Sequence, residues 1–83
     1  MAINPKQRVA LHAANLVEQN MVVGLGTGST ANFFIEALAK RCKAEKLNIQ
    51  TVSSSAISAV KAREAGLPVV SIADLDSLDI YVD

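Results

Sequence analysis

A short apolar run that ends in a glycine-rich turn and passes directly into a helical pattern limits the folds open to this chain. The run, Met21 to Leu25, is typical of a strand buried on both faces. The stretch GTGST follows at residues 26–30, and a helical pattern begins at Ser29 or Thr30 and continues to about Arg41. A buried strand joined to a helix by so tight a turn is a building unit of parallel sheets.

The same alternation of helix and strand continues on both sides of this unit. Asn4 and Pro5 suit the cap and first residue of a helix that would end near Asn20. The remaining elements are expected, in order, as a strand at 48–53, a helix from about 56 to 66, a strand at 69–72 after Pro68, a turn at 74–77 and a strand at 80–82. We therefore expect an α/β fold with a doubly wound, Rossmann-like, mostly parallel sheet and flanking helices, incomplete at the C-terminus.

Length and charge narrow the classes of partner. A chain of 83 residues suits one small domain, residues 1–83. Eight Lys and Arg balance eight Asp and Glu, so net charge predicts neither nucleic acid nor an anionic membrane as partner. The chain shows no signal peptide or membrane span, and the single Cys42 cannot form an internal disulfide. These features favour the cytoplasm and small-molecule or protein partners.

The polar residues of the chain gather where ligands bind in parallel sheets. In such sheets the ligand site lies beyond the carboxyl ends of the strands, where loops and helix N-termini meet. Three polar segments follow predicted strands, and these are the turn at 24–30, Ser53 to Ser55, and Asp83. We expect them to lie at one edge of the sheet.

The turn itself has the residue types of an anion site. Its glycines, Gly24, Gly26 and Gly28, permit positive φ and close backbone approach. The amides of residues 28–30 are expected to point outward from a helix N-terminus, where the helix dipole favours negative charge. Hydroxyl donors alternate with the glycines, which favours phosphate or a phosphorylated sugar. A tight strand-to-helix turn with a Ser or Thr cap, however, needs similar residues for purely structural reasons.

Two familiar glycine loops do not fit the spacing. The dinucleotide pattern G-x-G-x-x-G requires glycine where this chain has Ser29, and an acid about twenty residues later. The phosphate loop of ATPases requires lysine before Ser or Thr, but Gly28 precedes Ser29. The sequence therefore predicts neither NAD nor ATP as a cofactor.

Metal binding is not predicted either. His12 has no clustered ligands nearby, and it is interpreted as a surface or boundary residue. Asp74, Asp76 and Asp79 lack the glycine and the distant glutamate of a calcium loop, and they are interpreted as a solvated turn.

Three stretches together resemble a known family. They are GLGTGSTA at 24–31, SSS at 53–55 and LDSLDIYVD at 75–83, and in order and spacing they are similar to the N-terminal part of type A ribose-5-phosphate isomerase. The resemblance implies an enzyme of the pentose phosphate pathway that interconverts ribose 5-phosphate and ribulose 5-phosphate. It also implies no metal or redox cofactor, and a homodimer or homotetramer as the full-length enzyme.

The resemblance also implies which residues bind substrate. The family's T-G-S-T loop falls on Thr27, Gly28, Ser29 and Thr30, its first site acid on Asp83, and a phosphate-binding lysine on Lys6. The family's catalytic glutamate lies beyond residue 83, so no catalytic residue is assigned. The chain is thus expected to be an N-terminal portion of a sugar-phosphate-binding domain, cut before the rest of the catalytic site and inactive alone. The role of Ser53 to Ser55 is left open.

Two alternatives come from other classes of protein. The same strand, loop and helix platform occurs in sugar-phosphate-sensing domains, which bind an effector without catalysis. A structural or assembly fragment is the other alternative, and such a fragment should ignore phosphorylated sugars.

Overall fold

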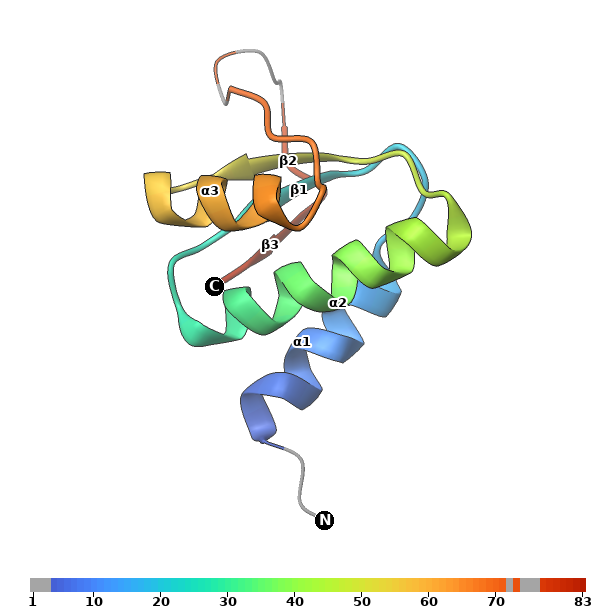
Figure 1. Cartoon of the computed structure of the whole chain (residues 1–83), viewed down its shortest axis with the longest axis vertical. Helices are drawn as coiled ribbons and strands as arrows, with labels where there is room; N and C mark the ends of the chain where they lie inside the picture. The colour runs from blue at the N-terminus through green and yellow to red at the C-terminus, as the bar shows by residue number, and fades with distance from the viewer. Residues whose placement is uncertain (1–3, 72, 74–76) are drawn as a thin grey trace.

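Helices and strands alternate along the chain. The computed structural model describes residues 4–71, 73 and 77–83. In chain order its elements are α1 (Pro5–Leu16), β1 (Val22–Leu25), α2 (Ser29–Glu45), β2 (Gln50–Ser53), α3 (Ala56–Glu64) and β3 (Ile80–Val82). In Figure 1, α1 and α2 lie together below the strands, and α3 lies on the side of α2 away from α1.

The strands form one parallel sheet with β1 in the middle. The order is β2-β1-β3, and both pairs are parallel. The register places Val23 of β1 beside Thr51 of β2 and Ile80 of β3. Because β2 and β3 flank β1 on opposite sides, the strand order reverses at β1, and sheets of this kind bind ligands at the carboxyl ends of the strands beside such a reversal. The expected incomplete Rossmann-like fold is confirmed.

The core joins residues of all three helices to the sheet. Phe34 and Leu38 of α2 are fully buried against Val23 and Leu25 of β1. On α1 the buried face carries small side chains such as Ala14, which allow this helix to pack closely on α2. Since α2 contacts both α1 and β3, its buried face holds the loop before it in a definite position relative to the sheet.

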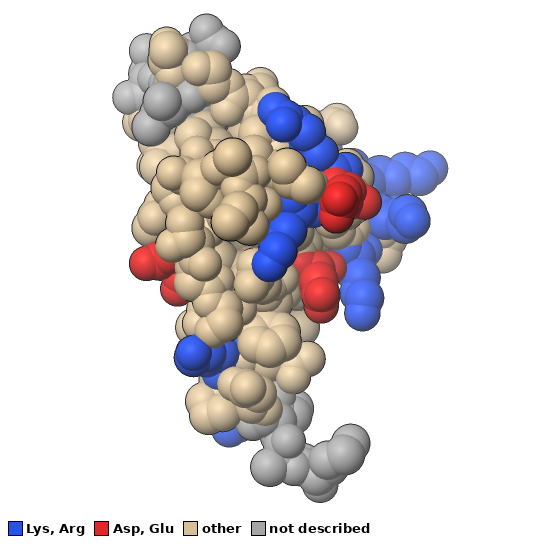
Figure 2. Space-filling view, turned by 60° about the vertical axis from the view of Figure 1, so that its left-hand side comes forward, with Lys and Arg blue, Asp and Glu red and all other residues tan. Residues whose placement is uncertain are grey.

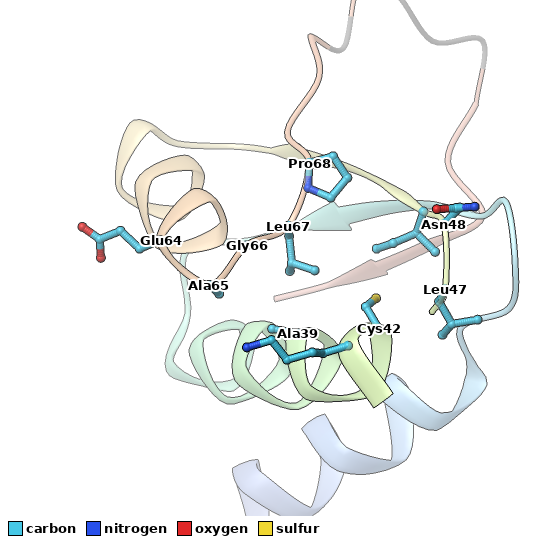
Figure 3. Close-up of a pocket in the computed structure, with 11 residues that line it drawn as sticks. Ala39, Cys42, Leu47, Asn48, Glu64, Ala65, Gly66, Leu67 and Pro68 are labelled. Atoms are coloured by element: carbon cyan, nitrogen blue, oxygen red, sulfur yellow. The ribbon is translucent and has the colours of Figure 1, made fainter. Parts of the chain in front are cut away.

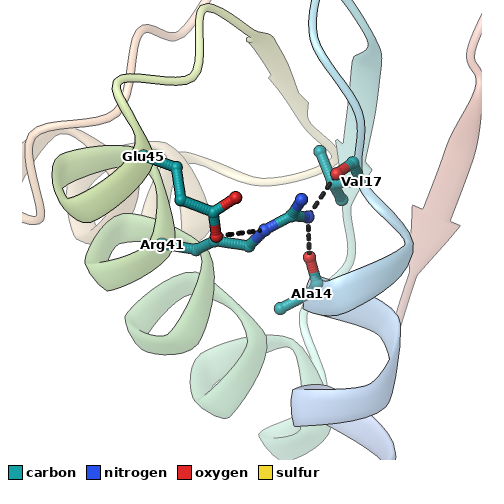
Figure 4. Close-up of polar contacts among 4 residues, drawn as sticks. All are labelled: Ala14, Val17, Arg41 and Glu45. Carbon is teal, nitrogen blue, oxygen red and sulfur yellow. Dashed lines mark hydrogen bonds and ion pairs between the residues drawn. The ribbon is translucent and has the colours of Figure 1, made fainter.

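The first helix ends earlier than the sequence indicates. We expected an end near Asn20, but α1 ends at Leu16, and Asn20 takes a left-handed conformation with φ 68°. Arg41 of α2 explains this end, because its guanidinium donates to the carbonyl of Ala14 at 2.7 Å and to that of Val17 (Figure 4). The last carbonyls of a helix have no partner within it, and here a neighbouring helix supplies one.

The second helix is longer than expected. It continues past Arg41 to Glu45, and Arg41 and Glu45 form an ion pair of 2.9 Å one turn apart. Lys46 ends the helix in the left-handed conformation, with φ 54° and its N–H bonded to the carbonyl of Cys42. The side chain of Arg41 is 19% exposed and is therefore largely packed between the two helices.

The strand predicted at 69–72 does not form in the part of the chain that the structure describes. Val69 makes a single parallel bridge with Thr51, flanked by bonds from Thr51 N to the Pro68 carbonyl and from Val70 N to the Thr51 carbonyl. Pro68 has no N–H to extend the pairing. Ile72 and most of the turn predicted at 74–77 lie outside the described residues.

Candidate functional site

The loop between β1 and α2 is held from both sides. The Gly26 N–H donates to the carbonyl of Val82 at the end of β3, at 2.7 Å. The Gly26 carbonyl accepts from the hydroxyl of Ser58 on α3, at 2.6 Å. Beside it, the amide of Ser54 donates to the carbonyl of Leu25 at 3.0 Å. The ends of three parallel strands therefore meet at this loop, as the sequence predicts.

Asp83 lies against the same loop. Its Oδ1 accepts the backbone N–H groups of Thr27 at 3.0 Å and Gly28 at 3.2 Å. Two loop amides are thus committed to a carboxylate on the next strand. The expectation that the Gly28 amide faces a ligand is wrong, because Asp83 already occupies it.

The glycines are required for close approach and not for positive φ. Of the four glycines only Gly66 has a positive φ, 92°, and Gly28 has φ −73°. A Cβ on Gly26 would lie 2.7 Å from the Cα and the Cγ of Asp83, and one on Gly24 would lie 2.6 Å from Cδ2 of Tyr81. Space beside β3 therefore selects glycine at these positions, and the expected conformational reason does not apply.

Beyond Gly28, the N-terminus of α2 is open. The first turn carries no acidic residue, and no side chain caps it. The amides of Ser29, Thr30 and Ala31 have no partner within the helix, by the geometry of an α-helix. The ammonium of Lys6, in the first turn of α1, donates to the Ser29 hydroxyl at 2.8 Å. A cation, hydroxyls and free amides together favour an anion at this point.

The serine cluster supports the loop. Ser55 caps α3, since its Oγ accepts the N–H of Ser58 at 3.2 Å. Ser53 Oγ is buried without a hydrogen-bond partner among the described residues. Ser58, which is 3% exposed and donates to the Gly26 carbonyl, was not predicted from the sequence. The spacing Ser55-x-x-Ser58 was the available signal, because a capping serine bonds the amide three residues later.

A hollow of about 520 Å³ lies at the opposite edge of the sheet (Figure 3). Its walls come from the end of α2, the start of β2 and the turn after α3, including Cys42, Asn48 and Leu67. Burial raises the pKa of the Cys42 thiol, and the Arg41 charge only partly opposes this. The thiol therefore stays protonated at neutral pH and is a poor nucleophile. This hollow lies at the amino ends of the strands, where α/β sheets rarely bind ligands.

Charged side chains on the rest of the surface are mixed in sign. Figure 2 shows most of the Lys and Arg side chains on one side of the face in view, with some of the Asp and Glu side chains between them. In the part of the chain that the structure describes, no group of three or more His, Cys, Asp or Glu residues is placed to hold a metal ion. No helix there combines the length and apolar character that a membrane crossing requires.

Comparison with known proteins shows which family the chain resembles. The chain is 44% identical to ribose-5-phosphate isomerase A of Lactococcus lactis subsp. cremoris over 80 residues, which are 96% of this chain and 36% of that protein. In sequence and fold, the chain is similar to the N-terminal portion of ribose-5-phosphate isomerase A. The resemblance seen in the three motifs is thereby confirmed. The chain spans about a third of the length of the curated ribose-5-phosphate isomerases that it matches.

Solved structures of ribose-5-phosphate isomerase have a similar fold over most or all of this chain. The enzyme from Methanocaldococcus jannaschii superposes with a TM-score of 0.87 at 38% identity, over 92% of this chain and 33% of that one. A ribose-5-phosphate isomerase solved in complex with phospho-erythronic acid also gives a TM-score of 0.87, at 33% identity, over 100% of this chain and 37% of that one. No family model matches the chain.

Proposed function

We propose that this chain forms the phosphate-binding and part of the sugar-binding site of a ribose-5-phosphate isomerase. Its substrates are then ribose 5-phosphate and ribulose 5-phosphate. The observation that carries this proposal is the contact of 2.8 Å between the Lys6 ammonium and the Ser29 hydroxyl, at the open N-terminus of α2. The L. lactis relative is named for this activity, and a related structure holds a phosphorylated sugar acid.

The phosphate is assigned to the first turn of α2. There it would accept hydrogen bonds from the amides and hydroxyls of Ser29 and Thr30, and it would pair with the ammonium of Lys6. Thr27 and Ser29 are exposed and Thr30 is partly exposed, so an incoming ligand can reach all three. A dianion at this point gains from the helix dipole and from a cation that needs no rearrangement to reach it.

The sugar is assigned to the side of the loop that faces Asp83. Its Oδ1 already accepts two loop amides, whereas its Oδ2 accepts no hydrogen bond from the described residues. That second oxygen suits a sugar hydroxyl, which is a donor. Because the carboxylate is tied to the loop, a ligand bound at α2 and a hydroxyl bound at Asp83 are held at a definite separation.

The reaction needs one group more than this platform offers. A base takes the proton from C2 of the aldose, the C1 oxygen gains a proton and the C2 hydroxyl loses one, and the resulting enediolate receives a proton from the base at C1 to give the ketose. Anchoring the phosphate positions C1 and C2 for that transfer. We assign the base to a part of the enzyme outside these 83 residues, and we assign no cofactor. The full enzyme is proposed to be a cytoplasmic homo-oligomer.

An amide NMR titration tests the proposal. We expect ribose 5-phosphate to cause saturable shifts of Thr27 to Thr30, inorganic phosphate to cause smaller shifts of Ser29 and Thr30, and NAD to cause none. Lys6→Met should weaken ribose 5-phosphate binding about tenfold, the effect of losing one charge-assisted contact. Arg8→Met, on the same helix turn, is the control and should leave the affinity unchanged.

Turnover completes the test. The 83-residue chain should bind ribose 5-phosphate without converting it to ribulose 5-phosphate. Conversion by pure chain would contradict the assignment of the base. A folded chain whose spectrum no sugar phosphate perturbs would reject the whole proposal and favour a structural fragment.

A further inference from the structure

Ser58 has a buried hydroxyl that is not used within its own helix. It lies in the first turn of α3 and is 3% exposed. A serine inside a helix commonly bonds the carbonyl three or four residues before it. The Ser58 hydroxyl instead donates to the carbonyl of Gly26, 32 residues away, at 2.6 Å. This bond joins α3 directly to the loop at the proposed phosphate site.

The bonded carbonyl belongs to a peptide group that is held at both ends. The Gly26 carbonyl and the Thr27 N–H are parts of one planar peptide, and in a trans peptide they point in opposite directions. Ser58 holds the oxygen at 2.6 Å, and Asp83 Oδ1 holds the N–H at 3.0 Å. Rotation of this peptide would break both bonds at once. The two contacts therefore define which face of the loop presents donors.

A second hydroxyl reinforces the first. The Ser55 hydroxyl donates to the Ser58 oxygen at 3.2 Å, so Ser55, Ser58 and Gly26 form a short chain of hydrogen bonds that all point the same way. Each bond in such a chain polarises the next. The cap of α3 and the conformation of the loop are thus coupled, which gives the Ser55 end of the serine cluster a role in the site.

Loss of the Ser58 hydroxyl would leave the buried Gly26 carbonyl without this partner. A buried carbonyl that loses its donor gains by turning toward solvent. That rotation would withdraw the Thr27 N–H from Asp83 and point an oxygen toward the Asp83 carboxylate. The two would repel each other, so Asp83 and the start of α2 would leave the separation at which the proposed site holds its ligand.

We propose that Ser58 is a positioning residue of the sugar-phosphate loop, acting through the Gly26–Thr27 peptide and without touching the ligand. The affinity part of this inference rests on the proposed function. The loop conformation is independent of that function and can be measured without ligand.

The test compares Ser58→Ala with three variants of the 83-residue chain. Ser58→Thr keeps the hydroxyl and should restore binding. Ser54→Ala removes an exposed hydroxyl of the same cluster. It keeps the hydrogen bond to Leu25, because the backbone N–H of residue 54 makes that bond. Ala62→Gly destabilises α3 from its buried side, away from the loop. The readouts are the affinity for ribose 5-phosphate and, without ligand, the amide shifts and hydrogen exchange of Thr27 and Gly28.

We expect Ser58→Ala to change the chemical shifts of the Thr27 and Gly28 amides and to speed their hydrogen exchange. It should also weaken ribose 5-phosphate binding about tenfold, or about 1.4 kcal/mol. Ser54→Ala and Ala62→Gly should leave both readouts unchanged at temperatures where they are folded. If Ser58→Ala does not fold, Ser58→Cys supplies a weaker donor of similar shape, and it should give the same changes at smaller size.

Two outcomes would overturn the inference. The first is a folded Ser58→Ala chain with wild-type amides and affinity, and the second is an equal loss in Ala62→Gly, which would show a general effect of weakening α3. Failure of the wild-type chain to bind sugar phosphates would instead reject the proposed function. In that case the ligand-free amide readouts would still decide the role of Ser58.

Discussion

At the scale of single residues, close contacts at the loop account for the site better than conformational freedom does. Gly26 and Gly28 lie against Asp83, and the carboxylate accepts two amides in the space that a Cβ would take. Lys6 lies on the other side of the loop with Ser29. The loop amides are thus divided between a resident carboxylate and the proposed phosphate.

Gly26→Ala should disrupt the contacts between the loop amides and Asp83. Its Cβ would fall 2.7 Å from the Cα of Asp83, so the loop and the end of β3 must move apart, and the bonds to Thr27 and Gly28 are lost. We expect a loss of ribose 5-phosphate affinity of more than about tenfold by calorimetry, or more than about 1.4 kcal/mol.

The matched control is Gly66→Ala, at the opposite edge of the sheet. Gly66 has φ 92° with no atom within 4 Å of an added Cβ, so alanine there costs about 1–2 kcal/mol of folding free energy through backbone strain alone. Its affinity for ribose 5-phosphate should stay at the wild-type value. Unchanged binding by Gly26→Ala would refute the role assigned to close approach.

At the scale of elements, the first helix is held at each end by a side chain outside it. Asn4 caps α1 by accepting the Lys6 N–H at 2.9 Å, and Arg41 of α2 satisfies the other end of α1. This second contact places α1 along α2, and so it helps bring Lys6 to Ser29 at the far end of both helices.

Arg41→Met should loosen the end of α1. The aliphatic stem is kept, but the carbonyls of Ala14 and Val17 lose a charged donor, so we expect a loss of about 1.5–3 kcal/mol of unfolding free energy. Urea titration measures the loss, and hydrogen exchange should show faster opening of the last turn of α1. Lys40→Met removes an exposed neighbouring cation and should change the unfolding free energy little. A wild-type urea midpoint in Arg41→Met would count against the cap.

At the scale of the whole molecule, a small core carries the fold. Domains of this size are stable by about 4–12 kcal/mol, at roughly 0.05–0.15 kcal/mol per residue. Phe34 is the largest of the fully buried side chains, and it joins α2 to the sheet and to α1. The position of the loop at the start of α2 therefore depends on a core that gives the fold only a small free energy of unfolding.

Phe34→Ala should remove a large part of that stability, and nearly all of it if the stability lies at the lower end of this range. Loss of a buried phenylalanine costs about 3–5 kcal/mol, so we expect a collapsed amide spectrum or a melting temperature near ambient. Val9→Ala is the control, because Val9 is 59% exposed and its loss should be nearly neutral. A cooperatively folded Phe34→Ala chain with the wild-type melting temperature would show that the core is not the source of stability.

Much of the fold could be predicted from the local pattern. The order of helices and strands, the parallel sheet and the last strand are confirmed, because apolar periodicity and turn residues are local signals. The similarity to ribose-5-phosphate isomerase A could be predicted from GLGTGST and the motif ending at Asp83. Two errors were at ends of helices, near Asn20 and after Arg41, where residues distant in sequence decide the end. The third was the whole strand predicted at 69–72, which is reduced to a single bridge among the described residues.

The sequence by itself therefore determined the alternation of elements, the position of the loop at the carboxyl edge of the sheet and the residue types around it. Only the tertiary structure decided that Asp83 takes the Thr27 and Gly28 amides, that Ser58 holds the Gly26 carbonyl and that Arg41 ends α1. The physical reason is that each of these contacts joins residues more than twenty positions apart. Such contacts exist only after α2 and α3 have packed against the sheet, and no local pattern records which of many polar groups will then meet.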